Sequence, residues 1–323
     1  MLEISVCRDL EEARRMWQRH WPRHCLFDLW PVRACFQDQF QNPPYFLVAR
    51  RGGKVCGLLA LSWIGEEGYF GHFPGEVWHG KTWLEQNKIV AADSRVVPAL
   101  MAHLPRETRI RYLVADDDLH LPAPAAVDEL GYLFFPGQFG YRFDAYQQSF
   151  AGKTRRKMRS ELNRLNARGV VLRHDHWADM DTLLRLNLDC YQDQSYFSDR
   201  RFRRAMVNLA IWLRDQDLLR LTTVLVGGRV AAVDMGAVWN GTYTVLAGGT
   251  HPDFPGVAKL INFHHMEWAC AQRVQVVDFL CGEFNWKDRF RLAARPLYTV
   301  EKTINTASLP QSPPLHEQAL CAV

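Results

Sequence analysis

The amino-acid sequence predicts an α/β (α+β) protein with two similar domains, each a mixed, mostly antiparallel sheet flanked by helices. The length of 323 residues is comfortable for two domains. A strand–turn–strand pattern occurs once in each half of the chain. Helical and strand patterns also follow a similar order around both copies, so a duplicated fold explains the chain better than one long domain.

The repeated pattern is the strongest of these observations. The first copy reads 46-FLVARRGGKVCGLLALSW-63, and the second reads 221-LTTVLVGGRVAAVDMGAVW-239. In both, Gly-Gly precedes a basic residue and a valine, which suits a hairpin because glycine accepts the positive φ of tight turns. A Phe-Pro-Gly triplet follows later in each half, at 73–75 and 254–256. The ordered series favours duplication, although two unrelated hairpins in an α+β protein would produce a similar local pattern.

The elements of the first half follow from hydrophobic spacing. Helical spacing predicts helices, and short apolar runs bounded by turn residues predict strands. The expected helices cover 8–20 and 31–41, and the expected strands cover 45–50, 55–63 and 68–73.

The second half begins with a helix over 153–168, whose apolar residues Met158, Leu162 and Leu165 form the inward seam. Gly169 stands where a helix often ends in the left-handed conformation. The remaining expected elements are strands at 170–173, 219–226, 229–239, 242–249, 274–280 and 297–304, and helices at 177–190, 199–214 and 257–272. We therefore predict domains at 1–148 and 149–306, and a loose Pro- and Ser-rich tail at 307–323.

Composition excludes several classes of protein. No stretch approaches the roughly 20 apolar residues that cross a bilayer, and the N-terminus lacks the apolar run of a signal peptide. We therefore expect a cytoplasmic protein without integral membrane association. The eight cysteines are scattered, and no Cys-x-x-Cys pair occurs, which is typical of reduced thiols. No convincing set of metal ligands is present, so we expect no metal. The sequence also has no nucleophile elbow, as a Ser/His/Asp hydrolase would need, and no Walker loop.

Charge is concentrated in one segment. Residues 1–150 carry a net charge of −2, and residues 151–323 carry +6. The segment 151-AGKTRRKMRSELNRLNARG-169 supplies this excess with seven basic residues and one acid. Arg155, Arg156 and Arg159 cannot all join the apolar seam of the predicted helix. They form either a solvated face or a contact for the phosphates of a donor, a tRNA or a lipid-linked sugar, because arginine binds phosphate oxygens in pairs.

The order of elements resembles the GNAT acyltransferase fold. The second half resembles the acetyltransferase-like domain of cellulose- and exopolysaccharide-biosynthesis proteins, which are relatives of the Fem aminoacyl transferases. Four segments carry the resemblance over about 151–305, and it is weaker over 1–145, which is interpreted as a degenerate copy. They are the basic helix before Gly169, the hairpin Gly227-Gly228-Arg229-Val230-Ala231-Ala232, the loop His251-Pro252-Asp253-Phe254-Pro255-Gly256, and Asp278-Phe279 with Gly282-Glu283-Phe284-Asn285-Trp286-Lys287.

The resemblance implies an acyl donor, such as acyl-CoA, whose phosphates bind backbone N–H groups where a loop enters a helix. Free N–H groups and the helix dipole favour an anion there. The matching residues in this chain are Gly256, Val257, Ala258 and Lys259. Asp253 stands where the family pattern has Gln or Arg, and a carboxylate beside a phosphate is unfavourable. A helix start formed by Pro and Gly explains the same residues without a ligand.

The resemblance also places carboxylates near the reacting atoms. We expect Glu283 to act as the general base, with Asp278 as its partner, because a partly buried carboxylate can accept a proton from an amine or hydroxyl. Lys287 would balance an anionic group of donor or acceptor. Structural alternatives are a turn capped by Asp278 and a surface position for Lys287.

Three further residues are candidates for acceptor binding. Asp234 is an acid inside an apolar strand, where a charge is costly unless it is paired or lines a site. Tyr243 and His251 follow in the same part of the chain and complete this set.

The predicted function is acyl transfer from acyl-CoA or an acyl carrier to an amine or hydroxyl of a sugar or peptidyl acceptor. One alternative is a Fem-like transferase that uses aminoacyl-tRNA. Another is a non-catalytic binding protein of the GNAT fold.

Overall fold

The computed structural model describes residues 1–115, 125–282, 287 and 289–303. The chain divides into two compact units. Of the described residues, the first unit comprises those within 1–130, 204–206 and 296–303, and the second comprises those within 131–203 and 207–295. The predicted tail at 307–323 lies outside the described residues.

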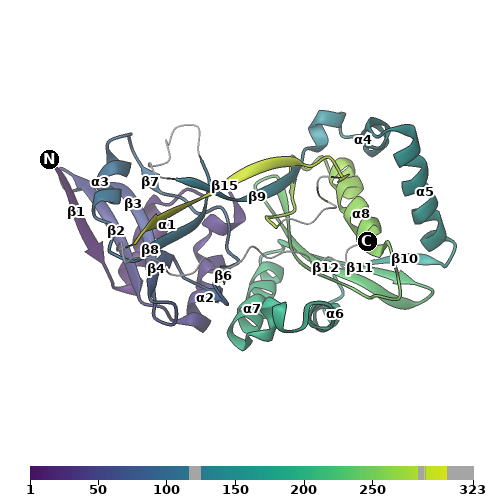
Figure 1. The fold of residues 1–323 in the computed structure, drawn as a ribbon, viewed down its shortest axis with the longest axis horizontal. Helices are drawn as coiled ribbons and strands as arrows, with labels where there is room; N and C mark the ends of the chain where they lie inside the picture. The colour runs from purple at the N-terminus through teal and green to yellow at the C-terminus, as the bar shows by residue number, and fades with distance from the viewer. Residues whose placement is uncertain (116–124, 283–286, 288, 304–323) are drawn as a thin grey trace. The chain divides into compact units, whose positions relative to one another are not determined.

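The first unit is built on a mixed sheet with the strand order β1-β2-β3-β4-β8-β15 (Figure 1). Strand β7 pairs with β3, and β5 and β6 form a small ribbon. The strands are β1 Leu2–Cys7, β2 Pro44–Arg51, β3 Lys54–Ile64, β4 Tyr69–His72, β5 Val77–Trp78, β6 Lys81–Thr82, β7 Val90–Ala91, β8 Thr108–Leu113 and β15 Ala293–Lys302, and the α-helices are α1 Leu10–His20, α2 Trp30–Phe40 and α3 Val96–Ala102.

The second unit has the strand order β9-β14-β13-β12-β11-β10. Its strands are β9 Ala126–Phe134, β10 Val170–His174, β11 Leu219–Val226, β12 Arg229–Trp239, β13 Thr242–Thr250 and β14 Val276–Asp278, and its α-helices are α4 Phe143–Ser149, α5 Gly152–Asn166, α6 Asp179–Tyr191, α7 Arg200–Asp215 and α8 Val257–Ala271. Every helix and strand predicted from the sequence is present, with ends that differ by a few residues. The sequence did not predict β1, β5, β6, β7, β8, β9, α3 and α4.

The two sheets repeat one arrangement, which confirms the predicted duplication. Strands β1-β2-β3-β4-β8 and β10-β11-β12-β13-β14 have the same order, and the last pair in each series is parallel. The hairpins even share a β-bulge. Ala49 pairs with Gly57 and Arg50 with Val55, so Cys56 is the extra residue in the first hairpin. Ala231 is the extra residue at the same distance from the Gly-Gly turn of the second.

Each sheet is completed by a strand from the other half of the sequence. Val277 and Asp278 of β14 pair with Phe134 and Leu133 of β9. In the first unit, β15 pairs with β8 over Thr108–Leu113. The units therefore differ from the predicted domains: residues 131–148 group with the second unit, and Pro296–Lys302 with the first.

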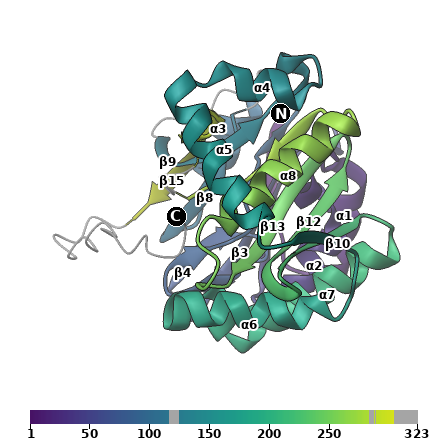
Figure 2. The same cartoon turned by 90° about the vertical axis from the view of Figure 1, so that its right-hand side faces the viewer.

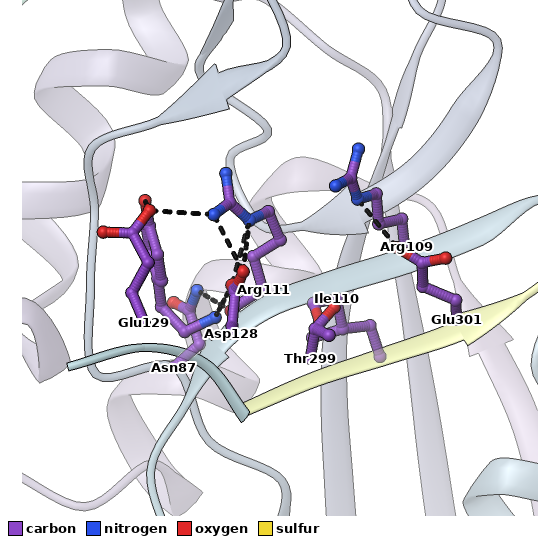
Figure 3. Close-up of polar contacts among 9 residues, drawn as sticks. Asn87, Arg109, Ile110, Arg111, Asp128, Glu129, Thr299 and Glu301 are labelled. Carbon is purple, nitrogen blue, oxygen red and sulfur yellow. Dashed lines mark hydrogen bonds and ion pairs between the residues drawn. The ribbon is translucent and has the colours of Figure 1, made fainter. Parts of the chain in front are cut away.

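A polar network holds the strand ends of the first unit (Figure 3). Arg111 of β8 donates to both carboxylate oxygens of Asp128 in β9 and to Glu129 at 3.0 Å. Tyr112 donates to the same oxygen of Glu129 at 3.1 Å, and Asn87 donates to the carbonyl of Arg111 at 2.8 Å. The bidentate geometry favours one orientation of the guanidinium.

Helices cover both faces of the second sheet (Figures 1 and 2). On one face, α8 and the α5 seam bury one apolar core with β11 and β12. Leu165 is buried in this core, and Leu162 packs against it, as the helical spacing predicted. On the other face, α6 lies close to Gly249 of β13. A Cβ built on Gly249 would come within 2.8 Å of the Leu186 Cβ and 2.9 Å of the Leu183 carbonyl oxygen. Only glycine permits this approach of helix and strand.

We predict that Gly249→Ala lowers the free energy of unfolding by about 1–3 kcal/mol, because the added methyl group overpacks against helix backbone. Gly152→Ala is the matched control, because a Cβ there meets no atom within 4 Å. Urea denaturation followed by circular dichroism measures both. Equal stability of Gly249→Ala and wild type would contradict the tight α6–β13 contact.

Candidate functional site

The backbone of β13 leaves its neighbour β14 part-way along its length. Thr242–Thr244 pair with Val276–Asp278 in a parallel ladder, and Asp278 stands opposite Thr244 in the last pair. Two residues later, Leu246 is the extra residue of a bulge, because Val245 pairs with Gly236 and Ala247 with Met235. Within the strands that the structure describes, Leu246 thus has no residue opposite it on either side. A bulge of this kind leaves backbone polar groups outside the ladder.

The loop after β13 leads into the N-terminus of α8. Gly256 has φ +86°, which favours glycine, and the amide of Val257 donates to the carbonyl of Phe254. The next bond along the helix runs from the Leu260 amide to the Gly256 carbonyl. Ala258 and Lys259 therefore have backbone N–H groups without a partner among the described residues. Such groups at a helix start attract an anion.

Ion pairs neutralise the acids around this loop. Arg229 donates to Asp253 at 2.9 Å, and this hydrogen bond lowers the pKa of the Asp253 carboxyl. The Arg168 and Arg229 guanidiniums lie 4.9 and 5.2 Å from the centre of the Phe254 ring. Asp253 is thus paired with a cation, which offsets the repulsion that its position in the sequence implied. Lys259 forms an ion pair with Glu161 of α5.

Asp278 is almost fully buried at the end of β14. One carboxylate oxygen accepts from the Leu280 amide at 2.9 Å, and the other accepts from Arg295 at 2.9 Å. The carboxylate closes the turn after the strand, which was the structural alternative to a catalytic role. It also stands at the point where β13 and β14 separate, so it can fix the geometry there.

Lys287 is buried rather than at the surface, which contradicts the structural alternative for it. Its ammonium donates to the carbonyls of Phe279, Leu280 and Cys281 at 3.1, 2.9 and 2.8 Å. It also lies 5.0 Å from the centre of the Tyr132 ring. Lys287 therefore holds the turn after β14. The predicted base, Glu283, lies outside the described residues.

The three residues assigned to acceptor binding are not together. Asp234 and Tyr243 point from the sheet toward α8, where His265 is completely buried. His265 contacts the Asp234 carboxylate through Nε2 at 2.9 Å, and Tyr243 Oη lies 3.4 Å from His265 Nδ1. His251 instead lies in the donor loop, where its Nδ1 accepts from the Asp253 amide at 3.2 Å.

A second cluster of polar side chains lies beneath α8 and was not predicted from the sequence. Arg220 of β11 contacts His264 Nε2 at 3.3 Å, and its guanidinium lies 3.9 Å from the centre of the Trp268 ring. His264 also stacks on His174 at 5.2 Å. Polar residues at alternate positions of an apolar strand, Arg220 and Thr222, were the signal that could have revealed it.

The basic residues of α5 separate into two sets. Arg155 is partly buried and donates to the carbonyl of Gln148 in α4 at 3.4 Å. Arg156 and Arg159 are exposed and line an open groove on the outer face of the helix. They are not among the residues that surround the α8 N-terminus.

In the first unit, side chains occupy the place beside β4 and β8, the strands equivalent to β13 and β14. Beside the β4–β8 ladder lies a cavity of about 20 Å³, lined in part by Arg33, His72 and Glu76. This volume suits about one water molecule. Arg33 is 1% exposed and donates to the carbonyls of Phe27, Phe73 and Glu85.

The described part of the chain contains neither a metal-ligand cluster nor a membrane-spanning helix. No three His, Cys, Asp or Glu side chains there gather as ligands for a metal ion. No helix there is long and apolar enough to cross a lipid bilayer.

Comparison with known families accounts for the geometry of the second unit. Residues 152–288 match the family model described as "Acetyltransferase (GNAT) domain". The second unit has the GNAT acyltransferase fold. No curated protein matches the chain.

Solved structures extend the GNAT likeness to both units. A conserved protein of unknown function from Bacteroides thetaiotaomicron has a TM-score of 0.55 and 13% identity, covering 92% of this chain and 99% of its own. FemX has a TM-score of 0.54 and 10% identity, with 91% and 96% covered. L-PGS from Bacillus licheniformis has a TM-score of 0.52 and 9% identity, with 94% and 95% covered. At these identities the likeness concerns the fold, and it confirms the predicted pair of GNAT-like domains.

We predict that Lys287→Met lowers the free energy of unfolding by at least about 2 kcal/mol, because three carbonyl oxygens lose their shared donor. Lys153→Met, at an exposed position of α5, is the control and should change it by less than about 0.5 kcal/mol. Chemical denaturation measures both variants. Similar stability of the two would show that the carbonyls do not depend on Lys287.

The partly buried His264 should make stability sensitive to pH. Burial, then repulsion from His265 and Arg220, lowers the pKa of His264 to about 3. The unfolded chain takes up this proton near pH 6.5, so protons favour unfolding as the pH falls from about 6.5 toward 3. The stability difference between wild type and His264→Asn should therefore shrink from pH 7 to pH 5 in urea denaturation. A difference independent of pH would contradict this assignment.

Proposed function

We propose that the second unit transfers an acyl group from a thioester donor, acyl-CoA or an acyl carrier, to an amine or hydroxyl of a sugar or peptidyl acceptor. The observation that supports this most is the pair of unbonded amides at the α8 N-terminus. A short loop connects these amides to β13, the strand that separates from β14 after Thr244 and has a bulge at Leu246. The family match over 152–288 supports the same reaction class.

In this proposal the amides of Ala258 and Lys259 hold a phosphate of the donor. Backbone N–H groups at the β13 bulge polarise the thioester carbonyl, whose oxygen gains negative charge in the transition state. The acceptor nitrogen or oxygen forms a bond to the carbonyl carbon, the carbon–sulfur bond breaks, and the thiol leaves. We assign Glu283 as the base that accepts the acceptor's proton, and Asp278 as a positioning residue. Direct attack needs no covalent enzyme intermediate.

The resemblance to exopolysaccharide-biosynthesis proteins supports a sugar acceptor and a cytoplasmic enzyme. A Fem-like reaction with aminoacyl-tRNA is the second candidate. The exposed arginines of α5 and the similar fold of FemX favour it. A binding protein that has lost catalysis is the third, and the base variant below separates it from an enzyme.

The donor site is tested by Ala258→Asp. A carboxylate in the first turn suits the helix dipole but repels a bound phosphate, so the fold should survive while donor binding fails. Acetyl-CoA, longer acyl-CoAs and CoA should raise the melting temperature of wild type but not of this variant. Ala145→Asp adds the same charge to the first turn of α4 and should respond like wild type. An unchanged response of Ala258→Asp would remove the donor site from α8.

The assigned base is tested by Glu283→Gln. We expect a loss of turnover of at least about 100-fold with donor binding retained, because the amide cannot accept the proton. Release of free thiol from the donor in the presence of candidate acceptors measures turnover. Full activity of the variant would exclude Glu283 as the base.

A further inference from the structure

We propose that the outer face of α5 docks an acidic acyl-carrier protein, which delivers the donor on its phosphopantetheine arm. This carrier face consists of Arg156, Arg159, Ser160, Asn163 and Arg164, which line one open groove. The proposal rests on the acyl transfer proposed above and names the form of its donor.

The carrier face has a strong and uncompensated positive charge. The one acid of α5, Glu161, forms an ion pair with Lys259 on the inner side. Arg155 contacts the Gln148 carbonyl, and Arg168 contacts the Phe254 ring. The remaining basic side chains of the helix have no ion-pair partner in the described part of the chain; they are Lys153, Arg156, Lys157, Arg159 and Arg164. Such a face attracts an acidic partner from solution.

The same helix lies against the donor loop. A Cβ built on Gly256 would be 3.8 Å from a methyl group of Leu165, and Phe254 and Leu165 share one core. The inner side of α5 is thus fixed at the α8 N-terminus, while the outer side is open. An α-helix with its side chains is about 10–12 Å across. A partner on the outer face therefore lies about one helix width from the free amides. Because the phosphodiester joins the arm to the carrier's serine, that serine must lie at the edge of α5 next to the α8 N-terminus, and the rest of the arm then extends toward the β13 bulge.

The charge at the loop favours an arm with one phosphate over free CoA. Two free amides, of Ala258 and Lys259, suit a single phosphate group. Arg229 and Lys259 are already paired with Asp253 and Glu161, so Arg168, on the Phe254 ring, is the cation at the loop that has no carboxylate partner among the described residues. One cation and two amides suit one phosphate better than three. A carrier-bound arm has one phosphodiester, whereas CoA has three phosphate groups.

An exposed apolar side chain on the α5 face of the sheet favours a protein over a nucleic acid. Leu172 of the edge strand β10 is 36% exposed and stands opposite Val224, which belongs to the core that α5 and α8 share. Figure 2 shows α5 and β10 on the same side of the second unit. Protein interfaces combine an apolar centre with a charged rim, whereas contacts to a phosphate backbone use basic and polar groups.

The test uses a purified bacterial acyl carrier protein in its holo and acetyl-loaded forms, with calorimetric titration against the full chain. Wild type should bind both forms, more weakly as salt is raised. The double variant Arg156→Glu/Arg159→Glu should bind at least about tenfold more weakly, because like charges then face each other. The control Arg15→Glu/Arg19→Glu reverses two exposed arginines of α1 and should bind like wild type. Melting temperatures of all variants verify folding.

The outcomes separate this proposal from the function on which it rests. If no carrier binds while acetyl-CoA still stabilises the protein, the docking proposal is overturned and the acyltransferase proposal stands. If the carrier binds wild type through this face but no donor supports turnover, docking stands and the proposed function fails. A gel-shift assay with tRNA is the third experiment. Binding of tRNA that depends on Arg156 and Arg159, without carrier binding, would assign the face to RNA.

Discussion

The packing of α8 against strands β11 to β13 is the contact on which the candidate site depends. Apolar side chains of the helix, the strands and α5 form one core, so the N-terminus of α8 cannot move independently of the sheet. Further along the helix, the buried contact between His265 and Asp234 fixes its rotation, because either group alone would be costly to bury. Both contacts together determine where the amides of Ala258 and Lys259 point. Asp234, which the sequence suggested as an acceptor ligand, thus has a structural partner.

Local patterns made most of the second unit predictable. The Gly-Gly hairpins, the seam of α5 and the Phe-Pro-Gly entry to α8 each depend on residues close together in the sequence. The pairing of β9 with β14 and of β15 with β8 was not predictable in this way, because each pair joins segments more than 100 residues apart. A different reason applies to Asp278 and Lys287, because their partners lie only 2 to 17 residues away but on a turn and a strand whose geometry the sequence pattern does not specify. Their sequence positions suggested catalysis, but their partners, Arg295, the Leu280 amide and three carbonyls, could be assigned only from the fold.

The two copies of the fold have diverged at equivalent strand ends. In the second unit, β13 separates from β14 beside a helix start with free amides. In the first, arginine and glutamate side chains fill the equivalent place, and Glu76 accepts from Thr82 and from the amides of Trp83 and Leu84. Buried polar groups that satisfy one another in this way stabilise a fold but leave little room for a donor. This difference between the copies agrees with our proposal that the donor binds in the second unit.

The most direct test of this account follows the backbone amides themselves. Deuterated, ¹⁵N-labelled protein would be titrated with acetyl-CoA and with acetyl-phosphopantetheine while amide chemical shifts are recorded. The account predicts that the amides of Ala258, Lys259 and Leu246 shift together and saturate at one ligand concentration. Saturable shifts confined to the first unit, or none at Ala258 and Lys259, would contradict a donor site at the α8 N-terminus.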